Sequence, residues 1–160
     1  MDTETLKGMA VVSVAEGTRL GHIKDLLIDP QALRVVALQV EGNGQTFLVP
    51  FDQLQSIGSD AVTVASSQVG QPLTAGGLGQ RLDLDRLRKL KVVDTAGTLL
   101  GDVRNVDIEG TSGQVTRLTA HKGGVLGLGG TTTVVGVEAI QSIGPELVTV
   151  TAGAGATPAQ

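Results

Sequence analysis

The two histidines, His22 and His121, are the side chains best suited to metal binding or to acid–base catalysis near neutral pH. A metal site needs several ligands at short spacings, and a catalytic histidine needs a nucleophile and an orienting group. Neither histidine has such companions nearby, and the chain has no cysteine to supply a thiolate ligand or nucleophile. We therefore expect no catalytic residue, no metal site and no cofactor in this protein, and interpret His22 as a solvent-facing strand residue.

Three aspartates, Asp25, Asp29 and Asp60, are the other candidates for acid–base chemistry. A catalytic carboxylate pair must lie about 5–10 Å apart across a cleft. Aspartate is also a common turn residue, because its carboxylate accepts hydrogen bonds from nearby backbone N–H groups. We favour turn capping for these residues, and for Asp25 a buried hydrogen bond to the backbone.

A glycine-rich segment, residues 123–130, has the sequence GGVLGLGG. A phosphate-binding loop would need a following Lys, and a dinucleotide fingerprint would need a following helix, and neither is present. We interpret the segment as the tip of an extended hairpin. Its apolar residues Val125, Leu126 and Leu128 are candidate contacts with a partner protein or, as the preferred alternative, with the other half of the chain.

The chain contains an internal repeat, and the candidate residues described above lie within its two copies. The spacing between equivalent residues is 80 or 81 early in the repeat and 86 late, so the second copy has about six extra residues between Thr119 and Thr133. Each copy spans about 60 residues, a size at which a domain is marginally stable alone, so we expect the copies to pack on each other or on a partner. The matching segments are Val11-Val12 and Val92-Val93, Gly17-Thr18 and Gly97-Thr98, Leu20-Gly21 and Leu100-Gly101, residues 55–58 and 141–144, and residues 62–64 and 148–150.

Composition indicates short strands, because the chain has 23 Gly and 21 Val in 160 residues. In the first copy the pattern predicts strands at 10–14, 20–29, 34–41, 45–49, 56–58 and 61–64, and a single turn at 52–54. Short antiparallel strands of this number bury an apolar face by curling into a barrel. The predicted fold class is all-β, with two tandem small antiparallel β-barrels of about six strands each. The predicted boundaries are 1–64 for the first barrel, 65–81 for a linker, 82–150 for the second barrel and 151–160 for a disordered tail.

The charge pattern limits the partners. The net charge is −4, whereas a nucleic-acid-binding domain is typically basic. Two phenylalanines are the only aromatic residues, which is too few for a surface on which the bases of a single strand stack. Basic residues between Arg81 and Lys91 alternate with Asp83 and Asp85, and we interpret them as a solvated or inter-barrel surface. Residues 82–89 can form one helical turn with Asp83 or Asp85 as the N-cap, or they can lead directly into the next strand. No apolar run is long enough to span a bilayer, and we expect a cytoplasmic protein.

Many positions in both copies resemble the PRC-barrel family. In the first copy they are residues 7–12, 17–25, 29–30, 48–54 and 56–58, and in the second copy residues 92–94, 97–101, 127–130 and 135–144. The second copy departs from the pattern at Gly136, where the first has Pro50, and at Asn105, where the first has Asp25. The resemblance covers roughly 120 residues and implies a small barrel of about six strands with no family-wide set of catalytic residues.

The family includes the cytoplasmic domain of the photosynthetic reaction centre H subunit and the C-terminal domain of a ribosome maturation factor. Binding to other proteins is their shared theme, so the resemblance implies a non-enzymatic protein-interaction module or adaptor whose partner is a protein or a second copy of the chain. Three alternatives stay open. One is a ribosome- or RNA-processing-associated factor, and another is an accessory protein of a photosynthetic or other membrane complex, associated peripherally with the membrane. The third is an enzyme or small-ligand binder, which would need a deep pocket with convergent polar groups.

Overall fold

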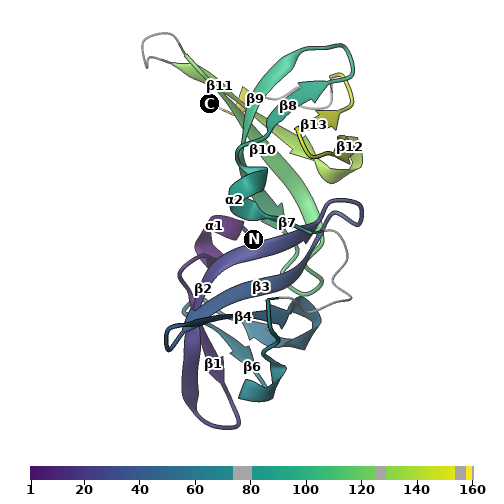
Figure 1. The fold of residues 1–160 in the computed structure, drawn as a ribbon. Helices are drawn as coiled ribbons and strands as arrows, with labels where there is room; N and C mark the ends of the chain where they lie inside the picture. The colour runs from purple at the N-terminus through teal and green to yellow at the C-terminus, as the bar shows by residue number, and fades with distance from the viewer. Residues whose placement is uncertain (74–80, 125–128, 154–157, 160) are drawn as a thin grey trace.

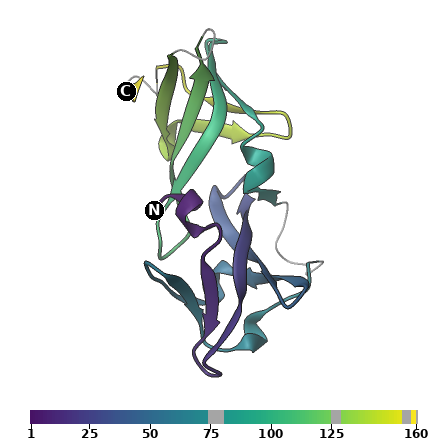
Figure 2. The ribbon, with the colours of Figure 1, turned by 90° about the vertical axis from the view of Figure 1, so that its left-hand side faces the viewer.

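The computed structural model describes residues 1–73, 81–124, 129–153 and 158–159. Two curled β-sheets are stacked end to end, and the two short α-helices lie between them (Figure 1). We call the region around the two helices, where the two units meet, the junction. In the view turned by 90°, one unit lies above the junction and the other below it (Figure 2). None of the described helices is long and apolar enough to cross a membrane.

The first unit is built from six strands in the order β4-β3-β2-β1-β6-β5. Along these strands buried and more accessible positions largely alternate, as expected when one face of a curled sheet lines a core. Its elements are α1 (Thr3–Leu6), β1 (Ala10–Ser13), β2 (Thr18–Asp29), β3 (Arg34–Gly42), β4 (Gln45–Pro50), the 3₁₀ turn η1 (Phe51–Gln53), β5 (Leu54–Ile57), β6 (Ala61–Val64) and the 3₁₀ turn η2 (Ser67–Val69).

The second unit repeats this order as β12-β13-β8-β9-β10-β11, with β14 added beside β11. The two tandem β-units predicted from the repeat are therefore present, with six core strands in each. Between the two runs of strands lie β7 (Leu82–Asp83), which pairs with β2 of the first sheet, and α2 (Leu84–Leu87). The elements of the second unit are β8 (Lys91–Asp94), β9 (Leu99–Ile108), β10 (Val115–Gly123), β11 (Gly130–Gly136), η4 (Val137–Ala139), β12 (Ile140–Ile143), β13 (Leu147–Val150) and β14 (Pro158–Ala159).

One pairing in each unit differs from the predicted antiparallel pattern. β1 pairs with β6 in parallel, and β13 pairs with β8 in parallel. The turns η1 and η4 are the reason, because each leads the chain into the next strand without the reversal that a hairpin would impose. The following hairpin then returns its second strand alongside the first strand of the unit.

A glycine in each unit allows two neighbouring strands to approach closely. A Cβ atom at Gly21 would lie 2.2 Å from the backbone oxygen of Glu41, and one at Gly101 would lie 2.2 Å from that of His121. Gly101 also has a φ of +125°, which side-chain-bearing residues rarely adopt. The repeated Leu-Gly pair of the sequence therefore marks the same close backbone approach in both units.

The predicted extended hairpin is present, because β10 and β11 pair from Arg117–Gly136 to Gly123–Gly130. Residues 125–128 lie outside the described residues, so the contacts expected for Val125, Leu126 and Leu128 stay a prediction. In the segment predicted as a linker, η2 is followed by Gln71, which bridges to Leu48 of β4. In the tail, β14 pairs with β11.

The two units share one hydrophobic core, as expected for domains of this size. A single cluster of buried residues includes Ile28 and Val35 of the first unit and Ile108 and Val115 of the second. Leu6, Leu84 and Leu87, from the two helices at the junction, are fully buried in the same cluster.

Candidate functional site at the junction between the two barrels

The two short helices are exchanged across the junction. α1 belongs to the first unit by sequence but packs on β9 of the second, and α2 packs on β2 of the first. Each helix begins at an aspartate that acts as N-cap. Asp2 accepts a hydrogen bond from the N–H of Glu4, and Asp83 accepts one from the N–H of Arg86. The predicted helical turn is thus present, and of the two candidate caps, Asp83 and Asp85, Asp83 is the N-cap.

Backbone pairing extends this exchange on both sides. β7, which leads into α2, pairs with Leu27 and Ile28 of β2. On the opposite side, Asp2 bridges to Asp107 of β9, and the Ile108 N–H donates to the carbonyl of Met1 at 2.7 Å. Residues 82–83 are therefore part of the sheet of the first unit, although the repeat predicts them at the start of the second.

The β2–β3 and β9–β10 turns meet at the centre of the junction. The Val35 N–H donates to the Gly113 carbonyl, and the Val115 N–H donates to the Leu33 carbonyl, both at 2.8 Å. A Cβ atom at Gly113 would lie 2.9 Å from the backbone oxygen of Val35, so the close approach requires glycine there. These two hydrogen bonds join the two sheets directly.

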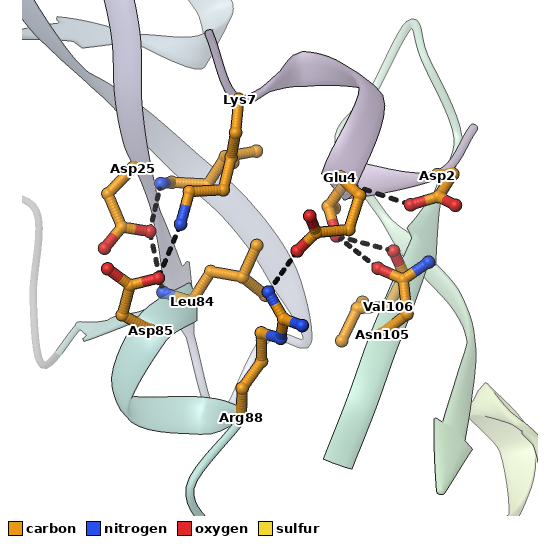
Figure 3. Close-up of polar contacts among 11 residues, drawn as sticks. Asp2, Glu4, Lys7, Asp25, Leu84, Asp85, Arg88, Asn105 and Val106 are labelled. Atoms are coloured by element: carbon orange, nitrogen blue, oxygen red, sulfur yellow. Dashed lines mark hydrogen bonds and ion pairs between the residues drawn. The ribbon is translucent and has the colours of Figure 1, made fainter. Parts of the chain in front are cut away.

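Two ion pairs connect the exchanged helices to each other (Figure 3). Lys7 pairs with Asp85 of α2 at 2.5 Å, and Arg88 pairs with Glu4 of α1. The hydrogen bond from Lys7 lowers the pKa of the Asp85 carboxyl below its usual value, so this carboxylate stays charged over a wider pH range.

Asp25 is the buried acidic group of the junction, with 5% of its surface exposed. Its Oδ1 atom accepts hydrogen bonds from the Leu26 N–H at 2.7 Å and, across the junction, from the Leu84 N–H at 3.2 Å (Figure 3). Burial raises the pKa of Asp25, and the nearby Asp85 carboxylate acts in the same direction. The predicted buried bond from Asp25 to the backbone is confirmed, and one of its donors belongs to the other copy.

Asn105 holds the equivalent place on β9. The Thr3 hydroxyl of α1 lies 3.0 Å from the Asn105 Oδ1 atom and donates to the Val106 carbonyl at 2.8 Å. Thr3 is fully buried, so this hydroxyl depends on protein acceptors instead of water. The two copies thus use different polar groups for the same task, which is to join a helix to the second strand of the other unit.

These contacts are related by an approximate two-fold symmetry. At a spacing of 81 residues, Lys7 of the first copy is equivalent to Arg88 of the second, and Glu4 is equivalent to Asp85. The Lys7–Asp85 and Arg88–Glu4 ion pairs are therefore equivalent to each other. The bridge between Arg34 and Gln114, which are 80 residues apart, joins equivalent positions of the two copies. The junction therefore has the isologous form found between the subunits of a symmetric dimer, within one chain.

The candidate residues named from the sequence are distributed over both units. His22 lies on β2 and His121 on β10, and no group of three potential metal ligands occurs among the residues that the structure describes. Asp29 accepts hydrogen bonds from the Gln31 and Ala32 N–H groups, which is the predicted turn capping. Asp60 lies in the exposed turn between β5 and β6, so the structure does not bring it to Asp25.

Sequence reasoning found α2 but missed α1, and with it the exchanged junction. A signal was available, because the spacing of 81 also aligns Asp2 with Asp83, Leu6 with Leu87, and Lys7 with Arg88. Extending the repeat toward the N-terminus would have predicted a capped helical turn in both copies. It would not have shown that each turn packs on the other copy, since local sequence does not determine the partner of a short helix.

Comparison with known proteins agrees with this architecture. The sequence model of the PRC-barrel domain matches residues 1–70 and again residues 80–156. An uncharacterised protein of Clostridium acetobutylicum is 31% identical over 67 residues, an alignment that covers 37% of this chain and 77% of that protein. The matched segments coincide with the two structural repeats, and together they include most of the chain. The protein therefore belongs to the PRC-barrel domain family and carries two copies of the domain in tandem.

Proposed function

We propose that this chain is a non-enzymatic protein-interaction module that presents the outer surfaces of two firmly joined barrels to a partner protein. The observation that carries the proposal is the junction, where backbone pairing, two ion pairs and a shared apolar cluster hold the barrels together. Two surfaces held in a fixed geometry bind a partner with a smaller loss of conformational entropy than two flexibly linked domains.

The sequence differences between the two copies support a function that depends on the outer surface of the barrels. The residues that form the junction occupy equivalent positions in both copies, whereas the extra residues of the second copy fall between Thr119 and Thr133 in the sequence, within the β10–β11 segment. In this proposal Val125, Leu126 and Leu128 of that segment are candidate contact residues. Serine replacements at these three positions test whether they contribute to binding.

The experiment is affinity purification of the tagged full chain, after mild crosslinking, from the organism that carries it. The proposal expects one protein recovered in near-stoichiometric amount, which then binds the purified chain and shifts its elution in size-exclusion chromatography. Recovery of the bait alone, under several growth conditions and crosslinker lengths, would contradict the proposal.

Two further results would favour the alternative functions. Ribosome association predicts sedimentation of the chain with ribosomal particles in a sucrose gradient, and its release as the salt concentration rises. Association with a membrane complex predicts recovery in the membrane fraction and release by mild detergent. Neither result is expected for an adaptor of soluble proteins, so both fractions are analysed together with the affinity purification.

A further inference from the structure

A groove of about 490 Å³ lies beside α2 on the second barrel. Four basic side chains line it, contributed by the two residues that follow α2, by β9 and by β10: Arg88, Lys89, Arg104 and His121. His121 is held in place by a contact of 3.0 Å between its Nδ1 atom and the Thr132 hydroxyl on β11. The groove is therefore formed by three elements of one barrel at the edge of the inter-barrel junction.

The two carboxylates and one of the basic side chains in the groove already have partners. Arg88 pairs with Glu4 of α1. Asp85 pairs with Lys7, and Asp102 pairs with Lys91 at 2.6 Å, and neither lysine lines the groove. Within the described residues, Lys89 and Arg104 are exposed and form no ion pair. The groove thus has an excess of positive charge on a chain whose net charge is −4.

The first barrel does not share this charge pattern. The residue equivalent to Arg104 is Lys24, and the residue equivalent to His121 is Glu41, by the spacing of 80 that relates the two copies. Lys24 and Glu41 pair with each other at 3.5 Å, which neutralises the equivalent surface. Lys89 has no basic counterpart, because the first barrel has Gly8 at the equivalent position, by the spacing of 81 that relates the helical segments. Because both barrels have the same strand order, the fold does not require the basic groove of the second barrel.

We propose that this groove binds an acidic segment of a partner protein, an inference that rests on the interaction function proposed above. Carboxylates spaced along a peptide can reach Lys89, Arg104 and His121 separately and avoid the paired Asp85 and Asp102. A nucleic acid would bring a continuous row of phosphates toward these two carboxylates and toward an acidic protein. The chain also has no Tyr or Trp on which bases could stack.

The test uses the full chain and a fluorescein-labelled peptide of alternating Glu and Gly residues, with binding followed by fluorescence anisotropy. The double variant Lys89→Glu/Arg104→Glu is expected to weaken binding at least tenfold. The matched control is Lys24→Glu on the first barrel, which is expected to change binding less than twofold. Raising the salt concentration should weaken binding of the wild-type chain, because the attraction acts between exposed charges. Circular dichroism checks that all variants are folded.

Three results would overturn the assignment: equal binding by the double variant and the wild type, equal weakening by Lys24→Glu, or tighter binding of a single-stranded oligonucleotide than of the peptide. Native partner recovery separates this proposal from the function on which it rests. If the double variant still recovers the partner, the assignment of the groove as the binding site is wrong, and the proposed interaction function stands. If the wild type binds the peptide but recovers no partner, the interaction function fails.

Discussion

Replacement of Asp25 tests whether its carboxylate joins the two barrels by accepting hydrogen bonds. Asp25→Ala removes the acceptor of the Leu26 and Leu84 N–H groups, both of which are buried bonds. Each unsatisfied buried donor costs about 1–3 kcal/mol, and removal of a poorly solvated carboxylate offsets part of the sum. We expect a net loss of about 2–4 kcal/mol in the free energy of unfolding, or roughly 5–12 °C in Tm for a chain of this size.

Asp25→Asn is the matched control, because an amide oxygen can still accept both hydrogen bonds and Asn105 fills the equivalent position in the second copy. We expect a loss below about 1 kcal/mol for this variant at neutral pH. The chain has no Trp or Tyr, so urea unfolding is followed by far-UV circular dichroism and thermal unfolding by calorimetry. Hydrogen exchange at the Leu84 amide, which should accelerate in Asp25→Ala and stay slow in Asp25→Asn, locates the change at the junction.

The pH dependence follows from the raised pKa of Asp25. A carboxyl group whose folded-state pKa is raised contributes stability that is complete below its unfolded value of 3.8 and is lost as the pH rises through the folded value. Asp25→Asn should therefore gain stability relative to the wild type as the pH rises through this window. Equal losses for Asp25→Ala and Asp25→Asn would refute the reasoning, because the charge and not the acceptor would then be the important feature.

Three further substitutions, one of them with a matched control variant, test other parts of the structure by urea unfolding. Gly101→Ala should cost at least about 2 kcal/mol, because the new Cβ meets the His121 backbone oxygen. Its control, Gly97→Ala, has a positive φ but open space around it and should cost less. Equal losses would contradict the explanation by close backbone approach. Thr3→Val should cost about 1 kcal/mol by removing a buried hydrogen bond to β9, and an unchanged midpoint would show that this bond contributes nothing. Hydrogen bonds from the N–H groups of its own turn lower the pKa of Glu109 to about 2. Glu109→Ala should therefore be less stable than the wild type above pH 4.5, with a difference that closes as the pH falls toward 2; a difference that is constant with pH would refute this.

Much of each barrel was predictable because its signals are local. The turn at Asp29-Pro30 and the alternation of apolar residues after Arg34 predicted β2 and β3 closely. A helical turn within residues 82–89 was predicted with Asp83 as one of two candidate caps. Asp25 was predicted as a buried backbone acceptor, but its second donor, the Leu84 N–H, lies 59 residues away and could not be identified from local sequence. The parallel β1–β6 pair was missed for a similar reason, because strand direction depends on how η1 redirects the chain.

The sequence by itself determined that this protein is a duplicated all-β chain. The reason is that the same spacing of apolar residues, glycines and capping aspartates occurs in both halves of the chain. Only the tertiary structure decided that α1 packs on β9 and α2 on β2, and that Lys7 meets Asp85. The physical reason is that a helix of four residues gains little stability alone and takes the apolar surface that the folded units offer. The basic groove is also a product of assembly, since its side chains come from α2, β9 and β10 and only the folded barrel brings them together.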